Sequence, residues 1–123
     1  MLLEVAASVD LGGRALLHLD VRSDNLCFVG TEVKLVDWNL AHAGNPIVDE
    51  AFWLPSLRLE GGPEPWELLP TTGGVSALVA GFFAARAGLP PPAGAPTVRE
   101  FQRQQAAVAL PWAASELGLA QPY

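Results

Sequence analysis

The sequence contains HLDVRSDNLCF at residues 18–28 and VKLVDWNLAHAGNP at residues 33–46, and these two segments say most about its architecture. The β-prone runs Leu26–Val29 and Val33–Val36 are joined by Gly30-Thr31-Glu32, which predicts a β-hairpin. Polar residues stand on both sides of it: H-x-D-x-x-x-x-N comes before, and Asp-Trp comes after. We therefore expect two polar loops held together by one hairpin, the kind of scaffold on which functional residues usually sit.

The segments before and after the hairpin region have helical patterns. Residues 2–9 predict the last turns of a helix that stops at Gly12-Gly13, followed by a short apolar run at residues 15–17. Pro46 suits the first turn of a second helix, which Pro55 should kink or end. The apolar positions of that helix are Ile47, Val48, Ala51, Phe52 and Leu54.

The C-terminal half predicts two further helices joined by loops. Residues 61–71 are rich in Gly and Pro and predict a loop. Apolar residues at helical spacing from Val75 to Phe83 predict a helix that stops at Gly88. Residues 89–96 form a linker, and the T-x-x-E capping box of Thr97 and Glu100 opens a last helix through Leu117, bent at Pro111. We expect one α+β, mainly α, unit: a short hairpin packed on about four helices.

Composition narrows the class of protein. Half of the residues are hydrophobic and 16% are charged, which excludes a disordered chain and suggests that some apolar surface is covered by another body. A net charge of −6 without a basic cluster argues against nucleic acid as a partner. Cys27 is alone, so no disulfide framework is expected. The sequence shows no signal peptide and no apolar stretch long enough for a bilayer, so we expect a soluble, cytoplasmic protein without membrane contact.

The two polar blocks supply the parts that phosphoryl transfer requires, since its catalysis is mostly positioning and charge neutralisation. Asp20 is the candidate catalytic base; the alternative is a turn aspartate that bonds its own backbone. Asn25 and Asp37 are the candidate Mg²⁺ ligands, because hard cations prefer oxygen donors. Asp37 ends an apolar run that we expect to be buried, where an unpaired carboxylate is costly.

Two further residues are expected to order the loops rather than to react. The ring of His18 can bond backbone carbonyls and fix the loop around Asp20. Asp49 lies near the start of its helix, where it complements the helix dipole or holds the loop through backbone N–H groups. Arg22 is expected to pair with a loop carboxylate, and His42 to be a loop residue without a chemical role.

Taken together, HLDVRSDN and LVDWNLAHAGNPIVDEAFWLP resemble the catalytic and metal-binding loops of the aminoglycoside phosphotransferase family, which shares the protein-kinase-like fold. The resemblance covers residues 14–60 closely. It implies Asp20 as catalytic base, Asn25 and Asp37 as Mg²⁺ ligands, and His18 as a loop-ordering residue. It also implies that residues 1–123 are part of a kinase-like C-terminal lobe. Leu19 stands where the family usually has glycine.

The resemblance implies ATP and Mg²⁺ as cofactors and a small molecule with a hydroxyl group as the substrate, of an aminoglycoside-like class. No nucleotide-binding lobe precedes the motifs, so ATP binding is expected to require that lobe and the chain alone to have little activity. Whether the chain is itself an enzyme stays open. The alternatives are a non-catalytic interaction module that retains the fold, and a choline- or homoserine-kinase-like enzyme. Apolar surface left uncovered predicts self-association.

Overall fold

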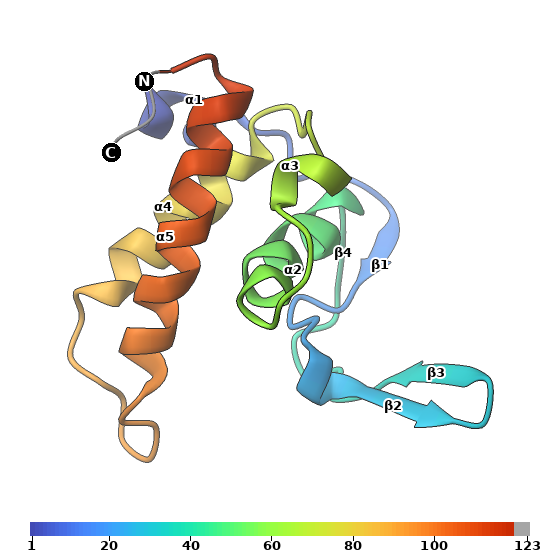
Figure 1. The fold of residues 1–123 in the computed structure, drawn as a ribbon. Helices are drawn as coiled ribbons and strands as arrows, with labels where there is room; N and C mark the ends of the chain where they lie inside the picture. The colour runs from blue at the N-terminus through green and yellow to red at the C-terminus, as the bar shows by residue number, and fades with distance from the viewer. Residues whose placement is uncertain (120–123) are drawn as a thin grey trace.

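The computed structural model describes residues 1–119 and shows a small α+β fold, about half helical, with two small antiparallel sheets (Figure 1). In chain order the elements are α1 (Leu2–Ser8), β1 (Ala15–Leu17), a 3₁₀ turn (Ser23–Asn25), β2 (Leu26–Val29), β3 (Glu32–Leu35), β4 (His42–Gly44), α2 (Ile47–Leu59), α3 (Pro65–Leu68), α4 (Val75–Ala87) and α5 (Val98–Glu116). Within residues 1–119 no helix combines the length and the apolar character that crossing a bilayer would require.

The core lies among α2, α4 and α5. The last two helices run side by side along one flank of the molecule (Figure 1). Small side chains let them approach closely: Ala77, Ala80, Ala109 and Ala113 are all buried. Trp112 is the largest fully buried side chain, and its indole N–H donates to the Leu69 carbonyl oxygen at 3.0 Å. This bond satisfies the one polar atom of the indole and ties the loop after α3 to α5.

Glu116, at the end of α5, fastens α5 to the start of α4. Its carboxylate accepts hydrogen bonds from the Thr72 backbone N–H at 2.6 Å, the Thr72 hydroxyl at 2.7 Å and the Ser76 hydroxyl. The Gly74 N–H adds a longer bond of 3.4 Å. The first N–H groups of a helix lack partners within it and favour negative charge. The Thr72 hydroxyl oxygen in turn accepts the Ser76 N–H at 2.9 Å, so the carboxylate on α5 holds the turn that begins α4.

The predicted hairpin is present and projects away from the helices (Figure 1). Its register pairs Leu26 with Leu35 and Val29 with Glu32, so Glu32 belongs to the strand and the turn is the two residues Gly30-Thr31. Gly30 has φ 61°, as the first position of a type II′ turn requires.

The second sheet was not predicted from the sequence. β1 pairs antiparallel with β4, with Leu17 opposite His42, in the segment where a loop was expected. His42 therefore lies in a strand. Three residues with no clear alternation, the last of them Gly44, give a pattern too short to be detected in the sequence.

Two local predictions about helices are wrong, and a third is wrong in part. Pro55 was expected to kink or end α2, and it does not end the helix, which runs on to Leu59; its ring is fully buried. The loop predicted for residues 61–71 contains α3, where the Glu67 carboxylate accepts from the Glu64 N–H at 2.7 Å. The Thr97 capping box does not form, because Thr97 has helical backbone angles and makes no side-chain cap. The helix α5 continues through Pro111 to Glu116, close to its expected end.

Candidate functional site

Asp20 and Asn25 face each other across the loop between β1 and β2. The 3₁₀ turn at residues 23–25 folds the chain back, so that the buried Asn25 donates from Nδ2 to the Asp20 carbonyl oxygen at 2.8 Å. The same Nδ2 lies 3.3 Å from the Asp20 carboxylate oxygen Oδ2. Because the amide nitrogen makes both bonds, the amide oxygen, which a cation would bind, is not engaged by Asp20.

His18 connects this loop to the segment after the hairpin. It is completely buried, and its Nε2 lies 2.7 Å from the Val36 carbonyl oxygen. Its Nδ1 accepts the Asp20 backbone N–H at 3.1 Å. A nitrogen that accepts a hydrogen bond carries no proton, so Nε2 is the protonated nitrogen and donates to Val36. The ring of Trp38 packs against the imidazole edge to face, with centroids 4.7 Å apart.

Asp49 reaches the same loop from the first turn of α2. Its two carboxylate oxygens accept the backbone N–H groups of His18 at 2.7 Å and of Leu19 at 2.8 Å. Leu19 has φ 66°, in the left-handed region that glycine favours. The carboxylate thus holds a backbone turn that a leucine does not adopt readily, directly before Asp20.

Asp37 lies beside Asn25, but not in the environment expected from the sequence. The Val36 N–H donates to the Asn25 carbonyl oxygen at 2.8 Å, which continues the hairpin register by one pair and brings Asp37 next to that pair. The strand β3 is exposed along most of its length, and Asp37 is exposed too. The expectation of a buried strand, and of a desolvation cost for its carboxylate, is therefore wrong.

The backbone at Asp37 is itself unusual. Its φ of 63° is in the left-handed region, which Asp tolerates better than most residues. The Asn39 amide donates to one of its carboxylate oxygens. This contact leaves the second carboxylate oxygen for another ligand.

The donor set fits a Mg²⁺ ion bound mainly through water and phosphate. Residues 1–119 hold no cluster of three His, Cys, Asp or Glu side chains arranged for a metal. Mg²⁺ does not need such a cage, since it is usually bound by one or two protein oxygens, several waters and substrate phosphates. The Asn25 amide oxygen and the Asp37 carboxylate are oxygen donors of that kind, on two segments joined by backbone hydrogen bonds.

Arg22 lies against the carboxylates of its own loop. Its Nε is 3.2 Å from Asp20 Oδ1 and 3.4 Å from Asp24 Oδ1. The same Nε is buried and makes no hydrogen bond of good geometry, so both contacts are ion pairs without a directed bond. The same loop makes a contact that was not predicted from the sequence. The Ser23 hydroxyl donates a hydrogen bond to the Glu60 carboxylate at 2.6 Å, and this bond connects the 3₁₀ turn to the end of α2.

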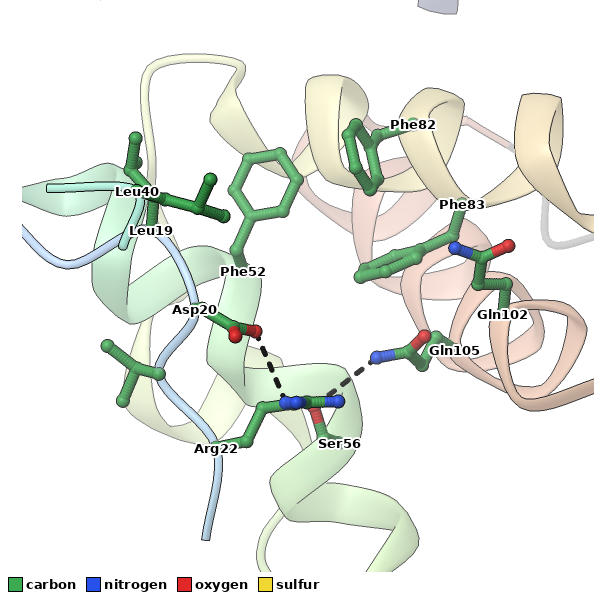
Figure 2. A pocket seen from close by; sticks show the side chains of 11 residues that line it. Leu19, Asp20, Arg22, Leu40, Phe52, Ser56, Phe82, Phe83, Gln102 and Gln105 are labelled. Carbon is green, nitrogen blue, oxygen red and sulfur yellow. Dashed lines mark hydrogen bonds and ion pairs between the residues drawn. The ribbon is translucent and has the colours of Figure 1, made fainter. Parts of the chain in front are cut away.

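A cavity of about 230 Å³ opens beside Asp20. Figure 2 shows Asp20, Arg22 and Phe52 on one side, and Phe83, Gln102 and Gln105 across from them. Phe83 belongs to the buried core, and Phe52 and Phe82 pack against it, so this wall of the cavity is also the edge of the core.

A scan of protein-family models and searches of curated proteins and of solved structures find no match to this chain.

Proposed function

We propose that this chain supplies the catalytic base and the Mg²⁺ ligands of a phosphotransferase that moves the γ-phosphoryl group of ATP to a hydroxyl of a small molecule. It corresponds, in this proposal, to part of a protein-kinase-like C-terminal lobe. The observation that supports it most is the Val36 junction. His18 bonds the Val36 carbonyl oxygen and Asn25 bonds the Val36 N–H, so the Asp20 loop and the Asp37 segment are held as one unit.

Each residue has a defined task in this reaction. Asp20 orients the acceptor hydroxyl and takes its proton as the new bond to phosphorus forms. Asn25 and Asp37 hold Mg²⁺, which when bound neutralises the charge of the phosphate oxygens. His18 and Asp49 are positioning residues: their hydrogen bonds to backbone groups fix the turn that presents Asp20.

ATP binding is proposed to require a nucleotide-binding lobe in addition to these residues. Phosphoryl transfer depends on holding the phosphates in line with the acceptor, and effective positioning accounts for several kcal/mol, roughly 7–11, of the barrier. In this scheme Asn25 and Asp37 bind the metal ion but not the nucleotide itself, so the chain by itself should turn over ATP negligibly.

The proposal is tested by titrating Mn²⁺, a spectroscopic substitute for Mg²⁺, into the whole chain without nucleotide, and following free Mn²⁺ by electron paramagnetic resonance. We expect one weak site whose affinity falls roughly tenfold or more in Asp37→Asn, since a charged ligand becomes neutral. Asp24→Asn removes the same charge from the loop before β2, next to Asn25, and should keep the site. Equal Mn²⁺ binding by wild type and Asp37→Asn would overturn the proposal.

A further inference from the structure

The cavity beside Asp20 has an apolar wall and a polar wall: six apolar residues line it together with Asp20, Arg22, Ser56, Gln102 and Gln105. It lies between the Asp20 loop and the helices α2, α4 and α5 (Figure 2). Phe52, Phe82 and Phe83 pack ring against ring, with centroids 5.2–6.0 Å apart, and Leu19 and Leu40 complete the apolar wall. A ligand in this space would meet aromatic and aliphatic surface while reaching Asp20.

The apolar surface extends beyond this cavity. A second hollow shares four lining residues with the first and adds Leu11, Val48 and Leu78. The shared residues are Leu19, Leu40, Phe52 and Phe82. The two hollows adjoin at these four side chains, and the residues that line the second are all apolar.

The charge around the cavity does not favour a cation. Among the residues described, Asp20 and Arg22 are the ionisable side chains that line it, and they form an ion pair. Two more arginines contact its walls from outside: Arg86 lies 3.6 Å from the centre of the Phe82 ring, and Arg99 donates to the Gln102 amide oxygen at 2.8 Å. Two acids contact its walls in the same way, Asp24 through Arg22 and Asp49 through the Leu19 N–H, so positive and negative side chains balance around the cavity.

The acidic residues that a polycationic substrate would need are engaged elsewhere. Asp49 accepts two backbone N–H groups, Glu60 accepts the Ser23 hydroxyl, and Glu64 pairs with Arg58 at 2.8 Å. None of them lines the cavity. A ligand amine placed there would lose its hydration without meeting a free carboxylate, which is costly.

The remaining polar groups suit an uncharged ligand. Ser56 and Gln105 are buried, and the Gln105 amide donates to the Ser56 hydroxyl over a long 3.4 Å. A hydroxyl and an amide can each donate and accept, so they can bond a hydroxyl or carbonyl oxygen of a ligand.

We propose that the acceptor substrate is an uncharged hydroxyl compound with an apolar, ring-containing body, and not a polyamine of the aminoglycoside class. This inference rests on the proposed phosphotransferase function for its chemical step. In that step the acceptor oxygen forms a bond to the γ-phosphorus of ATP, and the bond from that phosphorus to the bridging oxygen breaks. ADP leaves with the electron pair, and the acceptor proton passes to Asp20.

The test is a nuclear magnetic resonance titration of the whole chain with three probes: 2-phenylethanol, phenethylamine and kanamycin. The first two differ only in a hydroxyl or an ammonium group. We expect 2-phenylethanol to shift the side-chain resonances of Leu40, Phe82 and Gln105 saturably, phenethylamine to bind at least about threefold more weakly, and kanamycin to leave these resonances unchanged. Preferential binding of either amine at these residues, or no shift with 2-phenylethanol, would overturn the inference.

A charge-introducing pair of variants sharpens the test. Leu40 is exposed and outside the core, so Leu40→Glu should fold and should change the preference toward phenethylamine by roughly two- to fivefold. Leu89, exposed on the loop after α4 and not lining the cavity, gives the control Leu89→Glu. Equal effects of both variants would show that the amine is attracted by overall charge, against the inference.

The Mn²⁺ titration separates the two proposals. If Mn²⁺ binds through Asp37 and the alcohol does not enter the cavity, the substrate class is wrong and the phosphotransferase proposal stands. If the alcohol enters the cavity and Mn²⁺ does not bind, the phosphotransferase proposal fails, and the cavity can no longer be an acceptor site.

Discussion

Among the non-glycine residues at positions 1–119, Leu19 and Asp37 are the two with positive φ angles, 66° and 63°. Each adjoins or belongs to the candidate site. Backbone conformations of this kind cost about 1–2 kcal/mol for an L-residue and persist where surrounding contacts enforce them. At Leu19 the enforcing contact is the Asp49 carboxylate. The family resemblance pointed to this position, since it expects glycine there, but it could not identify the side chain that holds a leucine in place.

Asp49→Ala should destabilise the chain by about 1–2 kcal/mol, because two backbone N–H groups lose a charged acceptor. Asp49→Asn, which keeps one acceptor oxygen, should lose less. Glu50→Ala is the matched control, since it removes another acid from the same first turn of α2 and should change stability by less than about 0.5 kcal/mol. Urea unfolding measures all three; equal losses for Asp49→Ala and Glu50→Ala would contradict the role of Asp49.

Glu116 gives a pH-dependent prediction. Burial raises the pKa of Glu116, but hydrogen bonds from Ser76, Thr72 and Gly74 lower it by more, and the net result is below the ordinary value of 4.5. Because its pKa is lower in the folded than in the unfolded state, the ionised Glu116 contributes its full stabilisation above the unfolded-state pKa of 4.5. This contribution is lost as the pH falls through the lower pKa of the folded state.

Thermal melts between pH 7 and pH 3 should therefore show a loss of stability below pH 4.5 that is smaller in Glu116→Gln. The variant should also be less stable than wild type at pH 7. Glu100→Gln removes an exposed acid that pairs with Arg103 on the same helix and should leave the wild-type pH dependence in place. If Glu116→Gln loses stability at low pH as steeply as wild type, Glu116 is not the responsible group.

At the scale of elements, the sheet β1–β4 depends on a close approach that only glycine permits. A Cβ atom added at Gly13 would collide with the Gly44 carbonyl group, whereas one added at Gly81, inside α4, would meet nothing within 4 Å. Gly13→Ala should therefore destabilise the fold by more than about 1 kcal/mol. Gly81→Ala should stabilise it by about 0.5–1 kcal/mol, the helical advantage of Ala over Gly. Thermal melts measure both changes in stability. If both substitutions change stability in the same direction, the close approach of Gly13 to Gly44 does not require glycine.

Sequence reading predicted the elements with a long or well-punctuated pattern. The hairpin and the helices at residues 2–8, 47–59, 75–87 and 98–116 are present near their expected places. It missed β4 because three residues carry no period, and it allowed α2 to end at Pro55, where the helix continues because tertiary packing outweighs the local cost of proline. The hydrogen bonds at Glu116 join residues 40 or more positions apart, which no local pattern can reveal.

The candidate site was also predicted in part. Asp20, Asn25 and Asp37 were chosen as candidates by their spacing, and they lie on two segments joined at Val36. The exposure of Asp37 was not foreseen, because an apolar run reads as a buried strand even when it forms one arm of a projecting hairpin. The cavity needed three helices to be in place before its lining could be assigned.

At the scale of the whole molecule, the projecting hairpin exposes apolar side chains. Phe28 and Val33 are opposite each other across β2 and β3, and they are 75% and 57% exposed. An exposed apolar strand pair favours association with another surface. We expect the chain to self-associate at high concentration, as measured by sedimentation velocity, and the double variant Phe28→Ser/Val33→Thr to reduce it.

Leu3→Ser is a suitable control for that measurement, because Leu3 is 80% exposed on α1, outside the hairpin. A wild-type chain that stays monomeric at all concentrations would contradict the prediction. So would self-association that Leu3→Ser reduces as much as the hairpin double variant does.

The measurement that tests the proposed metal site most directly is paramagnetic broadening of the amide resonances of the ¹⁵N-labelled chain by substoichiometric Mn²⁺. The proposal expects the amides of Asp20, Asn25 and Asp37, and the Trp38 indole N–H, to broaden first, and Asp37→Asn to abolish the effect. Broadening that begins instead around Glu60 and Glu64, or that is unchanged in Asp37→Asn, would contradict the assignment of Asn25 and Asp37 as the metal ligands.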